Sequence, residues 1–392
     1  MRTFLKGKKV ILSWIFVCIT TLAHAQIIRE VFERANNGEI AAINEIGMEY
    51  FIGEKVPRDY ELAARWWGKA AEKGDAGAQV NLGNTLDFLK KYEEAFKWYI
   101  KAAYQNEFWA CAKVGEYYLF GKGIEENNEE AKTWYSRALK IGENEHVEEF
   151  AINYMQERLA LAMIYTNDSK QKAEGLTKLQ MIAEKGYGRA SGILASLYMT
   201  NTYVNADVEK VIYWLKKGSQ NNDAFSMREL GTYYSEGVYT MNGRCLLKKD
   251  CEKAINLWTA AANKGDGYAC QILGYYYYHE LHNKSEASKW YKKGMELNCG
   301  PAYFEYALIL YEENKMREAF NLFMEANDKI KDGHIDNYNN ILGNIQNSIG
   351  LYYDAGMPPV TQDKNEARKW YELAIQNGSK AAINNLKYLD SK

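Results

Sequence analysis

One pattern recurs along this chain of 392 residues, at spacings of about 32 to 47 residues from Ala42 to the C-terminus. Nine copies can be aligned, and the first supplies Ala42, Ile46, Gly47 and Tyr50 at positions 0, 4, 5 and 8. An α-helix has about 3.6 residues per turn, so positions 0, 4 and 8 form a stripe along one face. Each copy is therefore predicted to begin with a helix that buries this stripe.

Position 5 of the pattern holds only glycine or alanine. The nine residues are Gly47, Gly83, Gly115, Ala162, Ala195, Gly231, Gly274, Ala307 and Gly350. A glycine inside a helix costs about 1 kcal/mol relative to alanine, so its recurrence at one position requires a packing reason. We expect close backbone contact with a neighbouring helix at these positions.

A second helix is predicted in each copy. It begins with alanine, has an aromatic residue three positions later, then a small pair and a closing Gly or Asn, as in Ala63, Trp66, Ala70, Ala71 and Gly74. The same aromatic position is later filled by Trp98, Trp134, Trp214, Trp290 and Trp370. The glycines placed to end a helix in the left-handed conformation are Gly74, Gly142, Gly186, Gly265 and Gly378. The repeating unit is therefore helix, turn, helix and cap.

These residues resemble the Sel-1-like repeat, a branch of the tetratricopeptide superfamily. The resemblance is fullest in residues 42–74, where Gly53, Val56, Asp59 and Lys69 also occupy family positions. It implies an all-α fold, a right-handed alpha-alpha superhelix (solenoid) of about nine Sel-1-like, tetratricopeptide-like helix-turn-helix repeats. We expect one solenoid over residues 26–392, with a C-terminal capping helix near 381–389 and repeats that start near residues 42, 78, 110, 157, 190, 226, 269, 302 and 345.

Three segments depart from the pattern. Residues 143–186 have Lys178 where the aromatic residue is expected, and their first helix is longer. Residues 241–249 are predicted to form an extra loop. Residues 331–344 are rich in Asn, Asp and Gly, and this polar stretch could act as a joint before the last repeat.

Residues 1–25 have the pattern of a cleaved signal peptide. Arg2 and three lysines form a basic start, residues 10–22 are apolar, and Ala-His-Ala at 23–25 is a small-residue cleavage site. The apolar run is shorter than the roughly twenty residues that span a bilayer. We therefore predict an exported protein, periplasmic, on the cell surface or secreted, with no membrane span after cleavage.

The charge balance excludes two classes of partner. Cleavage removes four basic residues and leaves 45 Lys and Arg against 51 Asp and Glu. A mildly acidic chain without a block of Lys and Arg lacks the electrostatic footprint of a nucleic-acid or anionic-membrane binder. Neither nucleic acid nor a membrane surface is expected as a partner.

Catalytic and cofactor motifs fail in their details. A stretch that resembles a phosphate-binding loop has five residues, rather than four, between Gly115 and Gly121, and Gly123 stands where Ser or Thr would hold magnesium. His279 and His282 are spaced to share a helical face and bind zinc, although polar residues at a helix end are the more ordinary interpretation. We predict no enzyme activity, no cofactor and no metal.

Five cysteines lie after residue 25. Cys245 and Cys251 bracket the predicted extra loop. A disulfide between them would constrain the insertion, and the alternative is that both are thiols. Cys111 and Cys270 each follow the alanine that starts a first helix, and we expect them to be small buried residues.

Positions 2, 6 and 9 of the first helices form another face, whose residues change from copy to copy. By resemblance to tetratricopeptide arrays, this face lines the concave surface that holds peptides or partner helices. In the seventh and eighth copies it brings together Gln271, Tyr275, Tyr278, Phe304, Leu308 and Tyr311. Aromatic residues of this kind can each contribute about 2 kcal/mol to binding when desolvated, but they can equally pack against the neighbouring repeat. Both interpretations stay open.

The favoured hypothesis is a non-catalytic protein-protein interaction scaffold or adaptor of the bacterial cell envelope, which binds a protein or peptide on the concave first-helix face. The alternative is a glycan or peptidoglycan binder that stacks sugars on its tyrosines. An envelope hydrolase is a third class, but no histidine lies near a matched Ser or Cys motif.

Overall fold

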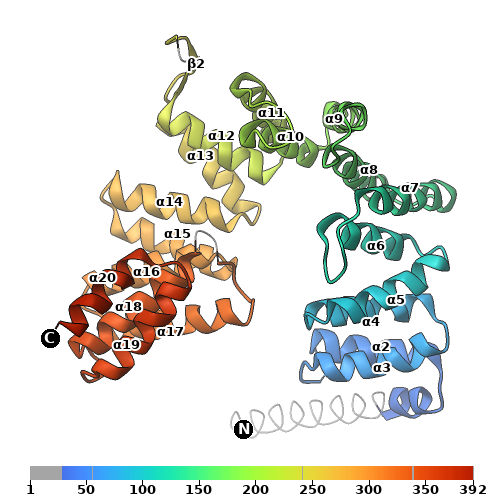
Figure 1. Cartoon of the computed structure of the whole chain (residues 1–392), viewed down its shortest axis with the longest axis horizontal. Coiled ribbons are helices and arrows are strands. Elements are labelled where there is room, and N and C mark those ends of the chain that lie inside the picture. The colour runs from blue at the N-terminus through green and yellow to red at the C-terminus, as the bar shows by residue number, and fades with distance from the viewer. Residues whose placement is uncertain (1–28, 55, 241, 338–339, 392) are drawn as a thin grey trace, which may run out of the picture. The chain divides into compact units, whose positions relative to one another are not determined.

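The computed structural model describes residues 29–54, 56–240, 242–337 and 340–391, so the predicted signal peptide lies outside the described residues. The chain divides into two compact units, Met1–Ile182 and Ala183–Lys392. Its helices are labelled in Figure 1, and successive helices pack in pairs within each unit. Among the described helices, none has both the length and the apolar character needed to cross a bilayer.

The helices alternate between the first and second members of each repeat. The first helices are α2 (Ile40–Ile52), α4 (Ala76–Phe88), α6 (Phe108–Phe120), α8 (Glu149–Ile164), α10 (Gly188–Thr200), α12 (Ala224–Glu236), α14 (Gly267–His279), α16 (Gly300–Glu312) and α18 (Ile341–Ala355). The second helices are α3 (Tyr60–Glu72), α5 (Tyr92–Tyr104), α7 (Asn128–Glu145), α9 (Ser169–Glu184), α11 (Val208–Gln220), α13 (Cys251–Asn263), α15 (Lys284–Glu296), α17 (Met316–Lys331) and α19 (Lys364–Gln376). A helix over residues 29–36 precedes them, and α20 (Lys380–Asp390) packs on α18 and α19. The predicted all-α repeat fold with a capping helix is confirmed.

Local sequence sets where many of these helices begin and end. The Asp59 side chain accepts a hydrogen bond from the Leu62 backbone N–H at 2.9 Å, and Asp363 accepts one from Glu366 at 3.0 Å. Each carboxylate satisfies a backbone donor that the helix itself leaves unpaired. At the other end, Gly74 and Gly378 have φ of +92° and +87°, a conformation that glycine adopts without strain.

Gly142 does not end a helix, contrary to the prediction. It lies inside α7, which continues to Glu145 and ends at His146, whose φ is 54°. A Cβ on Gly142 would lie 2.5 Å from the Ile152 side chain and 2.9 Å from the Phe108 ring. Glycine is therefore placed here for close packing of neighbouring helices rather than for a turn.

The glycines at position 5 face an aromatic ring of the second helix. The pairs are Gly47–Trp67, Gly83–Tyr99, Gly115–Tyr135, Gly231–Trp258, Gly274–Tyr291 and Gly350–Tyr371. A Cβ on each glycine would lie 2.5 to 2.9 Å from the nearest ring atom. The expected close contact is present, but it is made with a side-chain ring rather than with backbone. In most repeats this ring belongs to the residue after the recurring Trp.

The three repeats with alanine at position 5 have a side chain other than Trp or Tyr at the equivalent second-helix position. The corresponding residues are Ala162 with Leu179, Ala195 with Leu215, and Ala307 with Phe323, all of them buried. A larger residue on the first helix thus goes with a smaller one on the second. This compensation is what a close-packed interior requires.

The expected extra loop is a small β-hairpin. Strand β1 (Val238–Tyr239) pairs antiparallel with β2 (Cys245–Leu247). The turn is closed by a 2.8 Å hydrogen bond from the Gly243 N–H to the Thr240 carbonyl. Strands of two and three residues are too short to show the alternating pattern that identifies a strand in sequence.

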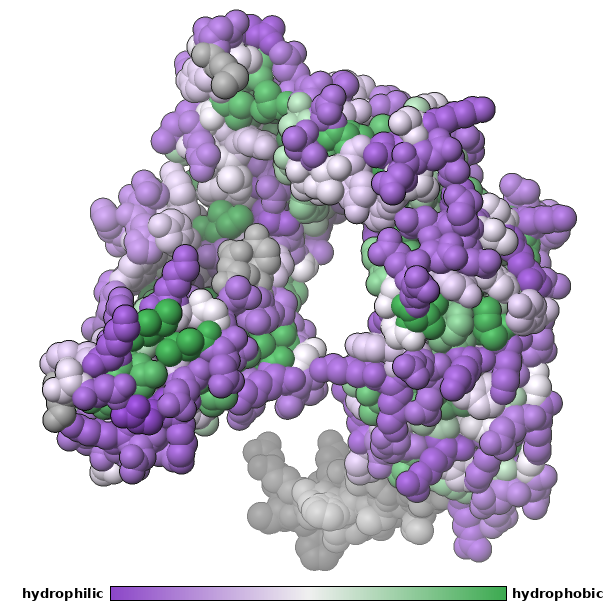
Figure 2. All heavy atoms as spheres, viewed as in Figure 1, coloured by the Kyte–Doolittle hydropathy of each residue, from purple (hydrophilic) through white to green (hydrophobic). Residues whose placement is uncertain are grey.

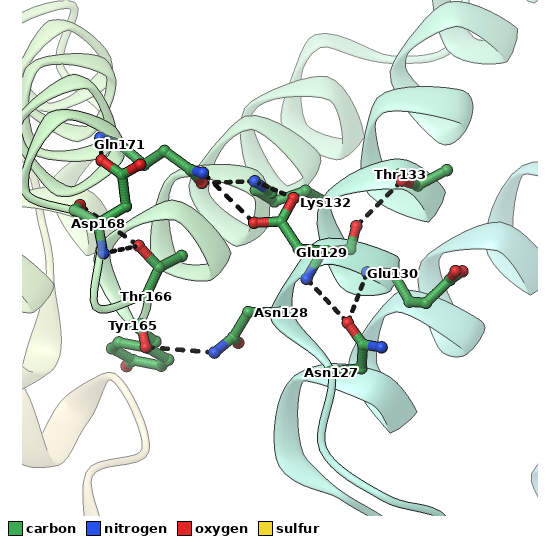
Figure 3. Close-up of polar contacts among 10 residues, drawn as sticks. All are labelled: Asn127, Asn128, Glu129, Glu130, Lys132, Thr133, Tyr165, Thr166, Asp168 and Gln171. Atoms are coloured by element: carbon green, nitrogen blue, oxygen red, sulfur yellow. Dashed lines mark hydrogen bonds and ion pairs between the residues drawn. The ribbon is translucent and has the colours of Figure 1, made fainter.

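Polar contacts tie α7 to the turn between α8 and α9, in the segment that departs from the pattern (Figure 3). The Asn128 side-chain amide donates to the Tyr165 carbonyl at 3.2 Å. Lys132 Nζ donates to Gln171 Oε1 at 2.5 Å and pairs with Glu129 at 2.6 Å. The contact between Lys132 and Gln171 joins the consecutive second helices α7 and α9, in the repeat where the recurring aromatic residue is missing.

The polar stretch between α17 and α18 is anchored by several of its described residues. Ile335 is buried. The Asp336 side chain accepts a hydrogen bond from the Gly300 N–H at 3.4 Å, and the Asn337 side chain accepts one from Leu342 at 2.9 Å. The role of this stretch as a joint stays a prediction.

Candidate partner-binding site

The six predicted site residues lie on α14 and α16, which contact each other in the second unit. Tyr275 and Tyr311 are 48% and 39% exposed. Gln271 and Tyr278 are half-buried. Tyr275 also lines a cavity between α12, α13 and α14.

Phe304 and Leu308 are half-buried and pack against the core of α16, α17 and α18. The Phe304 ring lies 5.9 Å from the ring of Phe323 on α17. These two side chains therefore contribute to packing between helices, which was the alternative interpretation of the aromatic group. The six residues divide into exposed and packed members, and their role in binding stays a prediction.

A polar cluster fixes Tyr278 across the two first helices. Its hydroxyl donates to Glu312 at the end of α16, and Lys284 Nζ lies 2.8 Å from the same carboxylate. The hydrogen bonds from Lys284 and Tyr278 lower the pKa of Glu312, while burial and Glu312 raise the pKa of Tyr278. Glu312 is therefore ionised and Tyr278 protonated at neutral pH, so this contact persists.

The exposed apolar surface continues beyond the predicted residues. Leu351 on α18 and Tyr388 on α20 occupy position 6, as do Tyr275 and Leu308, and they are 38% and 57% exposed. Helix α18 contacts both α16 and α20, and Figure 2 shows apolar surface gathered where these helices lie. The exposed residues Tyr275, Tyr311, Leu351 and Tyr388 are named the first-helix strip, together with the half-buried Leu308. Counting the same register through the last repeat and the capping helix would have found its last two members.

The equivalent face of the first unit is mixed, because Met48 of α2 is apolar and 41% exposed at position 6, whereas the next two first helices are polar there. Its position 6 includes Asn84, which accepts a hydrogen bond from the Tyr99 hydroxyl at 2.7 Å. It also includes Glu116, which pairs with Lys113 at 3.1 Å. In the second unit, by contrast, position 6 is apolar on the three successive first helices α14, α16 and α18.

Four of the predicted cysteine positions can be compared with the structure. Cys111 and Cys270 are fully buried, which confirms that expectation. Cys245 is an exposed thiol on β2, and Cys251 is a half-buried thiol in the first turn of α13. A bridge between these two thiols stays a prediction.

His279 and His282 do not share a helical face. His279 lies in the last turn of α14, and its ring centroid is 4.2 Å from that of Tyr275. His282 follows the end of the helix, with φ of 49°. In the described part of the chain, no group of three or more His, Cys, Asp or Glu side chains is placed to hold a metal ion.

Comparison with known proteins places these repeats in a family. The Sel1 repeat model matches residues 40–75, 110–142, 224–266, 267–299 and 346–379, and a tetratricopeptide repeat model matches 76–107. A Sel1 repeat protein from Oxalobacter formigenes is 32% identical, with a TM-score of 0.43, over 57% of this chain and 85% of that one. The chain belongs to the Sel1-like repeat family.

Similarity at the level of the fold extends over most of this Sel1-like repeat protein. A protective antigen present in uropathogenic Escherichia coli strains, which displays an SLR fold, is 23% identical over 92% of this chain and 82% of that one, with a TM-score of 0.52. No curated protein matches the chain. The matched segments leave out the repeats of α8–α9, α10–α11 and α16–α17, which are the three with alanine at position 5. Proteins of this family are generally protein-interaction scaffolds.

Proposed function

We propose that this Sel1-like repeat protein is a non-catalytic scaffold of the bacterial cell envelope that binds a protein or peptide through the first-helix strip. The observation that carries the proposal is a row of exposed apolar side chains on the adjacent helices α14, α16, α18 and α20. Soluble proteins rarely expose contiguous apolar patches of more than a few hundred Å² unless these serve an interaction.

The strip suits a protein better than a glycan. Leu308 and Leu351 lie between the tyrosines in the order of the helices, and their side chains cannot form hydrogen bonds with sugar hydroxyls. Apolar side chains of a protein partner would bury these leucines and stack on the tyrosine rings. A strip of mixed aliphatic and aromatic residues therefore favours a protein or peptide.

Three buried cysteines in the described part of the chain are poor nucleophiles. Burial raises the pKa of Cys111 and of Cys270 to about 11, and that of Cys299 to about 12. All three are thiols at neutral pH, whereas thiol chemistry requires the thiolate. This supports a role in binding rather than in catalysis.

The envelope location is supported by the basic, apolar and Ala-His-Ala segments of residues 1–25.

Affinity capture tests the proposal. The full mature chain, used as bait in an extract of the cells that produce it, should retain a specific protein. The double variant Tyr275→Ser, Leu351→Ser should retain at least about tenfold less of it, because two apolar anchors are lost while the repeat core is untouched. Retention is measured by quantitative mass spectrometry.

A matched control removes apolar surface elsewhere. Phe150 and Met181 are 65% and 57% exposed and lie outside the strip, so Phe150→Ser, Met181→Ser should retain as much protein as the wild type. Equal loss in both double variants, or retention of peptidoglycan without any protein, would contradict the proposal.

A further inference from the structure

A cavity of about 580 Å³ lies between α12, α13 and α14 in the second unit. Its apolar walls come from Trp258 of α13 and from Ile272, Tyr275 and Tyr276 of α14. This volume is within the range of ligand-binding pockets in proteins, roughly 300 to 1,000 Å³. Because Tyr275 also belongs to the first-helix strip, the cavity adjoins the proposed binding surface.

Several neutral polar groups of the cavity wall are already hydrogen-bonded. Trp258 Nε1 donates to the Arg228 carbonyl at 3.1 Å. Ser235 Oγ donates to the Thr232 carbonyl at 2.8 Å. These groups therefore have little capacity left for a ligand, and the charged groups decide which ligand the cavity prefers.

The charges at the cavity favour a cation. Glu236 at the end of α12 and Glu280 just after α14 both line it and are exposed. Neither carboxylate has an ion-pair partner among the residues that the structure describes. Among the described residues that line the cavity, Lys249 is the one cation, so the two carboxylates outnumber it.

We propose that this cavity holds an arginine or lysine side chain of the protein that the first-helix strip binds. The inference rests on the proposed function and adds the chemistry of the partner. A guanidinium or ammonium group is attracted to the faces of Tyr275 and Tyr276 and can donate hydrogen bonds to Glu236 and Glu280. The bound segment therefore carries a basic residue beside apolar ones.

Other side chains fit the cavity less well. An acidic side chain would be repelled by the two carboxylates. A purely apolar side chain would fill the aromatic part of the cavity but would desolvate Glu236 and Glu280 without giving them a partner. A basic side chain with an aliphatic stem satisfies both parts, because the stem contacts the rings and the charge reaches the carboxylates.

Selection from a random peptide library displayed on phage, with the full mature chain as target, tests this inference. Enriched peptides should contain Arg or Lys next to apolar residues. A synthetic enriched peptide should bind the Glu236→Gln, Glu280→Gln variant about tenfold more weakly than the wild type, since its charge-assisted hydrogen bonds are lost. Dissociation constants are measured by isothermal titration calorimetry.

The control variant Glu252→Gln, Glu296→Gln removes the same charge from two exposed carboxylates that do not line the cavity, and it should leave the dissociation constant unchanged. Enriched peptides that lack basic residues but depend on Leu351 would overturn this inference and leave the proposed function standing. Equal affinity for the cavity variant and the control would also overturn it. A selection that enriches no peptide would overturn the proposed function and this inference with it.

Discussion

Replacing Gly83 by alanine should lower the free energy of unfolding by about 2 kcal/mol, even though alanine is the better helix former. The new Cβ would lie 2.6 Å from Tyr99 Cε1. Tyr99 is fully buried and its hydroxyl is bonded to Asn84 at 2.7 Å, so the ring cannot move aside. Overpacking at the severe end of its range of about 1 to 3 kcal/mol exceeds the gain of about 1 kcal/mol in helix propensity. Urea unfolding followed by circular dichroism measures the difference.

Two further variants isolate the cause. Gly68 lies inside α3, and a Cβ added there would have no neighbouring atom within 4 Å, so Gly68→Ala should raise the free energy of unfolding by about 1 kcal/mol. Adding Tyr99→Leu to Gly83→Ala should recover part of the loss, because alanine occurs with leucine in the pair Ala195 and Leu215. If Gly83→Ala stabilised the protein as much as Gly68→Ala, the ring would not be the reason for the glycine.

Replacing Gln346 by leucine should lower the free energy of unfolding by about 3 kcal/mol. Gln346 is fully buried, and its Nε2 donates to Asn327 Oδ1 at 3.1 Å. Its Oε1 accepts a hydrogen bond from Asn377 Nδ2 at 3.0 Å. Leucine preserves most of the volume but removes both bonds. Asn327 Oδ1 is then a buried acceptor without this partner, which costs about 1 to 3 kcal/mol. The lost bond to Asn377 adds about 1 kcal/mol, because Asn377 is half-buried and keeps its bond to the Leu373 carbonyl. The same urea titration gives the loss.

The double variant Gln346→Leu, Asn327→Leu separates hydrogen bonding from shape. Asn327 is 1% exposed, so in the single variant its oxygen cannot turn to water. Replacing both partners by apolar residues of similar size is nearly neutral in such pairs, and the double variant should therefore be more stable than Gln346→Leu alone. A double variant less stable than the single one would show that packing, not the hydrogen bond, sets the cost.

The repeat could be predicted from the sequence because its signal is local. Positions 0, 4 and 8 require only the helical period, and the starting alanines from Ala42 to Ala302 lie in the first helices of the structure. At the position 5 glycine the sequence predicts close backbone contact, whereas the structure places there the ring that follows the recurring Trp in most repeats. In the pair Trp98 and Tyr99 both residues are aromatic, and only the register between two helices decides which ring is buried.

The candidate site could be predicted only in part. Its register identified Tyr275 and Tyr311, which are exposed, but whether Phe304 is free depends on Phe323 of the next helix. The cavity beside Tyr275 combines side chains from three helices with Lys249, which follows the hairpin, and Glu280, which follows α14. Such a combination depends on tertiary packing, so no spacing of residues in the sequence predicts the cavity.

Site-specific photo-crosslinking in the cells that produce the protein tests the central claim most directly. A benzophenone amino acid in place of Tyr275 or Leu351 should give a crosslinked protein adduct on illumination, because both side chains are predicted to lie within the bound interface. The same amino acid at Phe150 or Met181, which are at least as exposed, should give none. Adducts at all four positions, or at none, would contradict the assignment of the first-helix strip as a protein-binding surface.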